Sequence, residues 1–207
     1  MTTTATHPPR RVLAWANVSI DGYSSGPAGP MHDTWLQQHA VQEQTAAYAE
    51  SIWRGVDTAL LGRSNYDGFA SVWPEITRTT DAPRTRDLGT WLENVEKVVF
   101  TRSSTDVVWG NSRQSGDLPG EVRALTRTSG RDMLVLNSAS IIQQLLALGL
   151  IDDLRLTIVP VLLGGGLRLL PDGVSGDWRL LGTTTMAHGA VALHYRRCAP
   201  PAPDSEN

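Results

Sequence analysis

The sequence predicts one α/β domain in which helices cover both faces of a mostly parallel sheet, a three-layer α/β/α sandwich with a C-terminal antiparallel hairpin. Apolar runs of strand length alternate along the chain with stretches in which apolar residues recur at helical spacing. A chain of 207 residues is long enough for one core and short for two ordinary domains. With 41% hydrophobic and 19% charged residues, the composition is that of a globular protein. We therefore expect a single domain over residues 11–197.

The first half of this domain supplies a strand, a long helix and a second strand. Residues 11–20 are rich in apolar and β-branched types and stop at Asp21-Gly22, a pair that favours a tight turn. Residues 34–54 carry apolar side chains at spacings of three, four and seven, which predicts an amphipathic helix that begins after Asp33. Residues 56–61 are predicted to form a buried strand, and the polar stretch 77–87 a surface connection.

The second half continues the alternation and ends in a hairpin. The predicted elements are strands 97–101 and 107–109, a helix 118–128 capped by Asp117, strand 133–136, a helix capped by Ser138 and ended by Gly149, strand 154–163 bent or broken at Pro160, and hairpin strands 178–186 and 190–196. Gly164-Gly165-Gly166 is predicted to be a turn that needs positive φ, because no Lys-Ser or Lys-Thr pair follows it. Parallel strands need crossover connections, so the helices must lie on the faces of the sheet.

Charge and composition exclude several kinds of partner. The net charge is −3, so no broad basic surface is available to neutralise nucleic acid. Residues 1–10 lack the apolar core of a signal peptide, and no segment approaches the roughly 18 to 20 apolar residues of a membrane span. We therefore expect a cytoplasmic protein with no membrane partner. Cys198 is the single cysteine and no Cys/His cluster has metal-ligand spacing, so no metal is expected. Residues 1–10 and 198–207 are expected to be flexible ends.

Three strand ends carry residues suited to a phosphate-bearing ligand. The candidates are Gly62, Arg63, Ser64 and Asn65 after one strand, Asn137, Ser138, Ala139 and Ser140 after another, and Thr101 and Arg102 after a third. Where a strand opens into a helix, backbone N–H groups and the helix dipole favour an anion, and an arginine adds a charged fork for a phosphate monoester. N-capping, plain turns and solvated strand ends are the alternatives at these positions.

Polar residues also alternate along the first strand and its exit. Asn17, Ser19, Asp21 and Tyr23 share one face, and a ligand in a crevice at the sheet edge would supply the partners that such groups need. A plain turn at Asp21-Gly22 is the alternative. Most of the seven tryptophans are expected in the core, although one near the crevice, such as Trp35, would stack on a flat heteroaromatic substrate.

Three blocks of sequence resemble one known family. They are Asn17-Val-Ser-Ile-Asp-Gly-Tyr23, Leu61-Gly-Arg-Ser-Asn-Tyr-Asp67 followed by Trp73-Pro74, and the block from Leu145 to Gly166. Over residues 11–197 the chain resembles the reductase domain of the bacterial bifunctional riboflavin-biosynthesis deaminase-reductase and its stand-alone relatives in the dihydrofolate reductase superfamily. The resemblance implies a dihydrofolate reductase-like fold, NADPH as cofactor and a homodimer. The chain departs from the family at four positions. Asn137 stands where glycine is usual, Asn65 where threonine is usual, and Asp67 and Asp153 where glutamate is usual.

The resemblance assigns roles by position. The expected cofactor-binding residues are the ten at the three strand ends, with Thr101 and Arg102 facing the adenosine 2′-phosphate and Ser138 to Ser140 holding the pyrophosphate. The expected substrate-side residues are Asn17, Ser19, Tyr23, Trp35 and Tyr66.

Two hypotheses about function follow. The leading one is an NADPH-dependent reductase that transfers hydride to a C=N, C=C or C=O bond of a small heterocyclic or conjugated substrate. Asp21 is its candidate proton relay, because a carboxyl partly removed from solvent can have a raised pKa. The alternative is a dihydrofolate reductase-like protein that has lost NADPH use and acts as a small-molecule binding protein or a non-redox enzyme in the same crevice, as Asn137 and Asn65 would favour.

Overall fold

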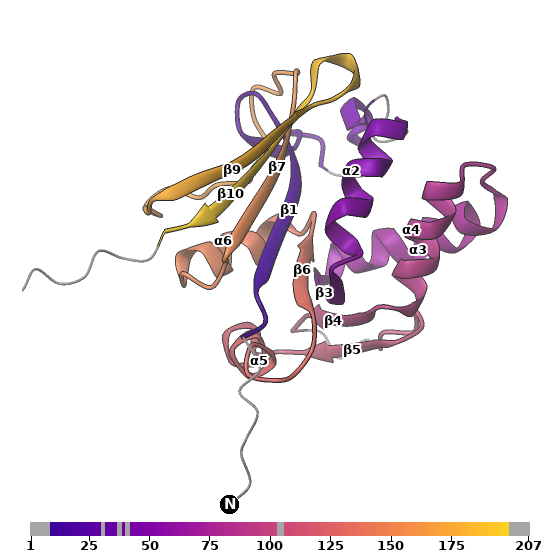
Figure 1. The fold of residues 1–207 in the computed structure, drawn as a ribbon, viewed down its shortest axis with the longest axis vertical. Coiled ribbons are helices and arrows are strands. Elements are labelled where there is room, and N and C mark those ends of the chain that lie inside the picture. Colours follow the sequence, from indigo (N-terminus) through magenta and orange to yellow (C-terminus); the bar gives the residue numbers. More distant parts are fainter. Residues whose placement is uncertain (1–8, 30–31, 37–38, 40–41, 103–105, 199–207) are drawn as a thin grey trace, which may run out of the picture.

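An eight-stranded mixed sheet forms the centre of the computed structural model, which describes residues 9–29, 32–36, 39, 42–102 and 106–198 (Figure 1). Its strands, in chain order, are β1 (Val12–Ser19), β3 (Val56–Gly62), β4 (Glu96–Phe100), β5 (Ser112–Ser115), β6 (Asp132–Leu136), β7 (Asp153–Val159), β9 (Trp178–Thr185) and β10 (Val191–Arg197). In space the order is β5-β4-β3-β6-β1-β7-β10-β9. The pairs from β5 to β7 are parallel, whereas β10 runs antiparallel to both β7 and β9. A mostly parallel sheet with a C-terminal antiparallel hairpin is therefore confirmed.

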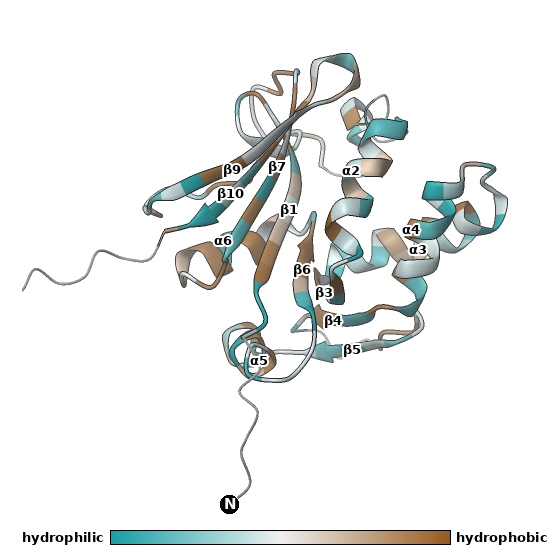
Figure 2. Cartoon of the chain, in the orientation of Figure 1, coloured by the Kyte–Doolittle hydropathy of each residue, from teal (hydrophilic) through white to brown (hydrophobic). Residues whose placement is uncertain are grey.

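Helices pack on both faces of this sheet. They are α2 (Glu43–Trp53), α3 (Arg63–Thr79), α4 (Pro83–Asn94), α5 (Leu118–Leu125) and α6 (Ala139–Ala147), with short 3-10 turns η2 (Thr34–Leu36) and η3 (Ala187–Gly189). One core cluster joins the sheet to α5 and α6, and a second joins the other face to α2, α3 and α4. Along β1, Val12 and Ala14 belong to the first cluster, whereas Leu13 and Trp15 belong to the second. Figure 2 shows apolar residues concentrated on β3, β6 and α6 and polar residues on the edge strand β5. The three layers are confirmed.

The helical segments before and after β3 differ from the prediction. Between residues 34 and 54 the structure has η2 and the shorter helix α2, and Asp33 accepts a hydrogen bond from the Gly26 N–H at 2.8 Å, so it does not cap α2. Ala40 and Val41, which supported the longer helix, lie outside the described residues. The surface connection predicted for residues 77–87 is wrong, because α3 runs to Thr79 and α4 begins at Pro83. The polar outer surface of these helices hid the helical period, since Tyr66 is the one buried residue among the described residues of α3.

Other boundaries also changed for local reasons. Residues 107–109 are not a strand, and the edge strand β5 begins at Ser112 instead. β7 ends before Pro160, whose ring nitrogen has no hydrogen to donate to a neighbouring strand. Asp117 caps α5 as predicted, by accepting a bond from the Gly120 N–H at 3.0 Å. The triple glycine forms a turn, and at Gly166 (φ 116°) a Cβ would lie 2.1 Å from the Ser25 carbonyl oxygen. This close approach lets β8 (Leu167–Arg168) pair with β2 (Tyr23–Ser25).

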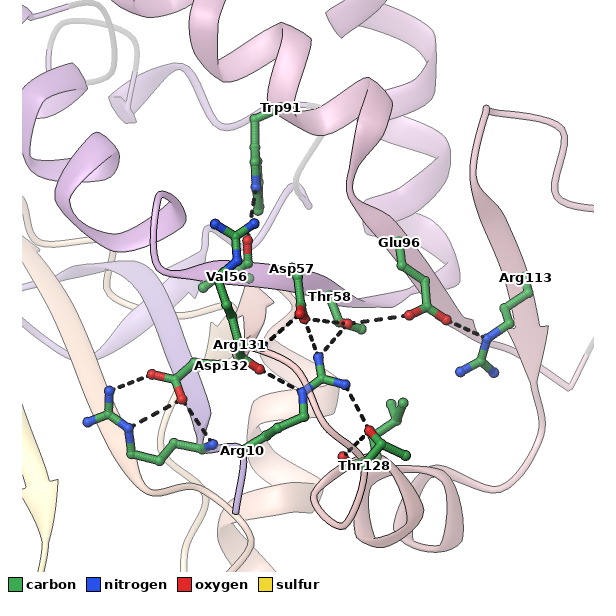
Figure 3. Close-up of polar contacts among 12 residues, drawn as sticks. Arg10, Val56, Asp57, Thr58, Trp91, Glu96, Arg113, Thr128, Arg131 and Asp132 are labelled. Atoms are coloured by element: carbon green, nitrogen blue, oxygen red, sulfur yellow. Dashed lines mark hydrogen bonds and ion pairs between the residues drawn. The ribbon is translucent and has the colours of Figure 1, made fainter. Parts of the chain in front are cut away.

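A polar network centred on Arg10 joins the amino ends of β1, β3 and β6 (Figure 3). Arg10 is 6% exposed, so its assignment to a flexible N-terminal segment is wrong; residues 1–8 lie outside the described part of the chain. Its guanidinium donates to the Arg131 carbonyl at 2.6 Å, to Thr128 Oγ1 at 3.2 Å and to Thr58 Oγ1 at 2.6 Å, and it pairs with Asp57. These bonds hold Arg10, which lies just ahead of β1, against the starts of the neighbouring strands, at the edge of the sheet opposite their carboxyl ends.

Candidate functional site

A continuous cleft of about 1010 Å³ lies along the carboxyl ends of five parallel strands. Its lining includes residues at or just beyond the ends of β5, β4, β3 and β6, together with Asn17 near the end of β1. Neighbouring strands lie about 4.8 Å apart, so five adjacent strand ends span roughly 19 Å. The cleft has the length for an extended ligand, and it occupies the edge at which open α/β sheets bind their ligands.

All ten residues predicted to bind a cofactor line this cleft. They are Gly62, Arg63, Ser64, Asn65, Thr101, Arg102, Asn137, Ser138, Ala139 and Ser140. They come from three loops that are far apart in sequence, and the parallel register of β3, β4 and β6 brings them to one edge. Their proximity is as predicted, and their role in cofactor binding stays a prediction.

Ser138 joins two of these strand ends. It is 3% exposed, accepts a hydrogen bond from the Gly62 N–H at 3.1 Å and donates its hydroxyl to Asn65 Oδ1 at 3.0 Å. Its side chain therefore does not cap α6, which corrects the prediction, although Ser138 stands at the N-cap position. Within the described residues neither α3 nor α6 has a side-chain cap, so both helix starts leave N–H groups for an anionic ligand.

Asn137 occupies a backbone conformation that favours glycine. Its φ is 49°, in the left-handed region, where asparagine is among the best tolerated of the other residues. The side-chain oxygen accepts a hydrogen bond from the backbone N–H of Asn17 at 3.1 Å. The Asn137 amide is thus bonded to β1, which weakens the expectation that it crowds a dinucleotide at α6.

The cleft carries its positive charge after β3 and β4. Arg63 donates to Asp67 at 2.9 Å, and this bond raises the pKa of the Arg63 guanidinium. Arg102 is exposed and lines the cleft one strand further from β1. An anionic end group would meet these two cations together with the start of α3.

Asp21 does not match its expected role as a proton donor. The Ser19 hydroxyl donates to Asp21 Oδ1 at 2.6 Å, and the N–H groups of Leu163 and Gly164 donate to the same carboxylate at 3.1 and 2.7 Å. These bonds, led by that of Ser19, lower the pKa of Asp21 to about 2, so the expected raised pKa is wrong. Asp21 is also absent from the cleft lining among the described residues. The alternative, a turn at Asp21-Gly22, is what the structure shows, with Gly22 at φ 88°.

The low pKa of Asp21 predicts an acid-dependent loss of stability. The ionised carboxylate should stabilise the fold above pH 3.8, the ordinary pKa of this side chain, and this contribution should fade as the pH falls toward the folded value of about 2. Asp21→Asn should therefore be less stable than wild type at about pH 6, and the difference should shrink between about pH 4 and about 2.5. Urea unfolding of both proteins across this range is the measurement. A difference that stays constant with pH would contradict the assignment.

Of the five predicted substrate-side residues, one lines the cleft. Asn17 does so, whereas Ser19 holds the Asp21 turn and is 1% exposed. Tyr66 is 2% exposed, and its hydroxyl accepts a hydrogen bond from the backbone N–H of Trp109 at 2.7 Å. Tyr23 packs beneath Arg168, whose Cζ lies 5.1 Å from the ring centroid. Trp35 precedes the lining residue Leu36 but is not itself part of the described lining.

Several lining residues were not predicted from the sequence. They include Ser24, Ser25, Asp33, Leu36, Phe69, Ser115, Gly116 and Leu167. Ser115 ends β5 and Gly116 follows it; β5 has no apolar run, so no local strand signal points to this junction. The pairing of β2 with β8, which no local pattern reveals, brings Ser25 and Leu167 together.

Two other kinds of site are absent from the described part of the chain. No helix there is long and apolar enough to cross a membrane. No three His, Cys, Asp or Glu side chains of those residues gather in a way that could hold a metal ion.

Comparison with known proteins identifies relatives of this fold. A family model described as RibD C-terminal domain matches residues 10–192. The uncharacterized protein YyaP of Bacillus subtilis (strain 168) is 26% identical over 188 residues, which cover 90% of this chain and 94% of YyaP.

Solved structures extend the likeness. A putative riboflavin biosynthesis protein from Shewanella sp. PV-4 superposes with a TM-score of 0.67 at 22% identity, covering 91% of this chain and 99% of that one. Dihydrofolate reductase from Enterococcus faecalis, complexed with NADP(H), superposes with a TM-score of 0.59 at 13% identity, covering 90% of this chain and 96% of that one. A single Thermotoga maritima protein, a diaminohydroxyphosphoribosylaminopyrimidine deaminase/5-amino-6-(5-phosphoribosylamino)uracil reductase, superposes with a TM-score of 0.62 at 15% identity. The match covers 92% of this chain and 57% of that one. At such identities these structures establish the fold alone.

Proposed function

Because this chain belongs to the RibD C-terminal domain family, we propose that it is an NADPH-dependent reductase that transfers hydride to a C=N, C=C or C=O bond of a small heterocyclic or conjugated substrate. The family and the structural neighbours support a reductase-type function. The NADP(H) complex of the Enterococcus dihydrofolate reductase supports the cofactor.

The observation that carries the proposal is the cleft itself. Arginines stand after β3 and β4, two uncapped helix starts follow β3 and β6, and polar residues without a cation lie beside β1. This order suits a molecule with phosphates at one end and an uncharged reactive ring at the other.

Glycines along the cleft support the fit of a bulky cofactor. Gly62 has an ordinary φ of −74°, and a Cβ there would approach Ser140 and Ile141 no closer than 3.5 Å, so the protein alone does not require glycine. Gly68 lies inside α3, where glycine costs about 1 kcal/mol relative to alanine, yet a Cβ would meet nothing within 4 Å. Both line the cleft, and the space that they leave is where a cofactor would lie against the backbone.

The residues of the chain would bind and orient the reactants. The starts of α3 and α6 would hold phosphates, Arg102 would pair with the 2′-phosphate, and Asn17 with its neighbours would hold the substrate beside the nicotinamide. NADPH, when bound, supplies the hydride. The proton would come from water or substrate-borne groups, since the pKa of Asp21 is too low for donation at neutral pH.

Isothermal titration with NADPH and NADH tests the cofactor. We expect saturable NADPH binding, and Arg102→Ala should weaken it about tenfold or more while leaving NADH binding unchanged, because a phosphate monoester loses its charged partner. Arg123→Ala, an exposed arginine on α5 outside the described cleft lining, is the matched control. Absence of saturation with either nucleotide in folded protein would defeat the proposal and favour the binding-protein alternative.

The homodimer implied by the resemblance stays a proposal. β9 is an edge strand with exposed Leu180 and Leu181, at 49% and 40% exposure, and such edges favour pairing with another chain. Light scattering of the purified protein measures its mass in solution. A mass of 22.5 kDa, that of a single chain, would exclude the dimer.

A further inference from the structure

One end of the cleft lacks positive charge. We define the β1 end as the lining residues Asn17, Ser24, Ser25, Asp33, Leu36 and Leu167. Asp33 is its single charged residue, and it is half-buried. The other described lining residues with charge are Arg63, Arg102 and Asp117, which all follow β3, β4 or β5.

None of the lysines and arginines of the chain lines the β1 end. The chain has 18 lysines and arginines, and every one falls in the part of the sequence that the structure describes. Lys97, the single lysine, is fully buried and donates to the carbonyls of Leu92 and Val95 at 2.7 and 2.9 Å. Arg168 pairs in register with Tyr23 and lies over its ring, outside the described lining. Arg168 is thus the exposed arginine that directly follows a lining residue of the β1 end, Leu167, and its guanidinium lies against Tyr23.

Hydrogen bonding reinforces this bias toward acceptors. The Ser24 hydroxyl donates to the Leu167 carbonyl at 3.2 Å, and the backbone N–H of Asn17 donates to Asn137. One carboxylate oxygen of Asp33 accepts the Gly26 N–H. These two donors are thus bonded within the protein, whereas the carboxylate and hydroxyl oxygens of this end keep lone pairs for a ligand.

We propose that the β1 end selects a neutral or cationic substrate that bears N–H donors, and rejects substrates with a phosphate or carboxylate there. This inference rests on the proposed function, in which the substrate occupies the β1 end. A phosphate brought beside Asp33 would lose its hydration without gaining a cation, and like charges would repel. The chain would then differ from the Thermotoga protein, whose named substrate carries a phosphoribosyl group.

Two pairs of probes that differ in charge test the proposal: benzamidine against benzoate, and uridine against uridine 5′-monophosphate. Each is titrated by saturation-transfer NMR into protein saturated with NADP⁺, which occupies the arginines after β3 and β4. We expect benzamidine to bind about tenfold more tightly than benzoate, and uridine to bind no more weakly than its monophosphate. Asp33→Asn, which keeps an acceptor for the Gly26 N–H, should remove most of the benzamidine preference.

The outcomes separate this proposal from the function on which it rests. If NADP⁺ does not bind, the proposed function fails by that measurement, and the same titrations on Arg63→Gln/Arg102→Gln protein still report the charge preference. Tighter binding of benzoate than of benzamidine, or of the monophosphate than of uridine, would overturn the inference. If Arg168→Ala then abolished this preference for the anion, Arg168 would be the cation responsible. Failure of all four probes to bind would overturn it as well.

Discussion

Gly62→Val is expected to weaken NADPH binding by roughly a hundredfold, about 2.7 kcal/mol, while leaving the protein folded. The backbone at Gly62, with φ −74° and ψ 153°, accepts any residue, and the nearest atoms to an added Cβ are 3.5 Å away. The new side chain would stand between the end of β3 and the start of α6, where the phosphates of the cofactor would pass. Isothermal titration measures the affinity, and thermal unfolding shows that the fold persists.

Gly182→Val supplies the matched control for this substitution. Gly182 lies in the exposed strand β9, and a Cβ there would meet nothing within 4 Å. The same change of side chain should therefore leave NADPH affinity as in wild type. Equal affinities of the Gly62→Val and wild-type proteins would mean that the cofactor does not cross the end of β3.

Arg10→Met is expected to lower the free energy of unfolding by about 3 to 5 kcal/mol, because it removes the donor of a buried network. The Arg131 carbonyl and the hydroxyls of Thr58 and Thr128 would lose their bonds to the guanidinium (Figure 3). Asp57 would lose its ion pair but keep the Arg131 N–H, at 2.7 Å. Urea unfolding at neutral pH measures the change.

The neighbouring residue provides the comparison for Arg10. The Arg11 side chain is 43% exposed and pairs with Asp132 and Asp153 from the surface. Arg11→Met should therefore cost less, about 1 kcal/mol, because solvent screens the Arg11 side chain and the buried Asp153 keeps its bonds to Arg196 and His194. If Arg10→Met and Arg11→Met lower the free energy of unfolding equally, the buried network around Arg10 does not contribute the extra stability proposed for it.

Local pattern was sufficient where structure depends on neighbours in sequence. Strand and helix alternation predicted the three layers, and the residues after β3, β4 and β6 were identified because a strand that opens into a helix is a local signal. Parallel register then required those strand ends to meet at one edge. The prediction failed at α3 and α4, where a polar outer surface masks the helical period.

Tertiary structure alone decided the charge and exposure of individual side chains. Asp21 reads as a candidate proton donor until the fold supplies its hydrogen bonds. The Ser19 hydroxyl, together with the N–H groups of Leu163 and Gly164, 142 and 143 residues away, lowers the pKa of its carboxyl. Arg10 reads as part of a loose terminus until acceptors 48 and 121 residues away surround it. Desolvation and hydrogen bonding act through space, so a linear sequence specifies which groups can titrate or bind, and the fold determines which of them do.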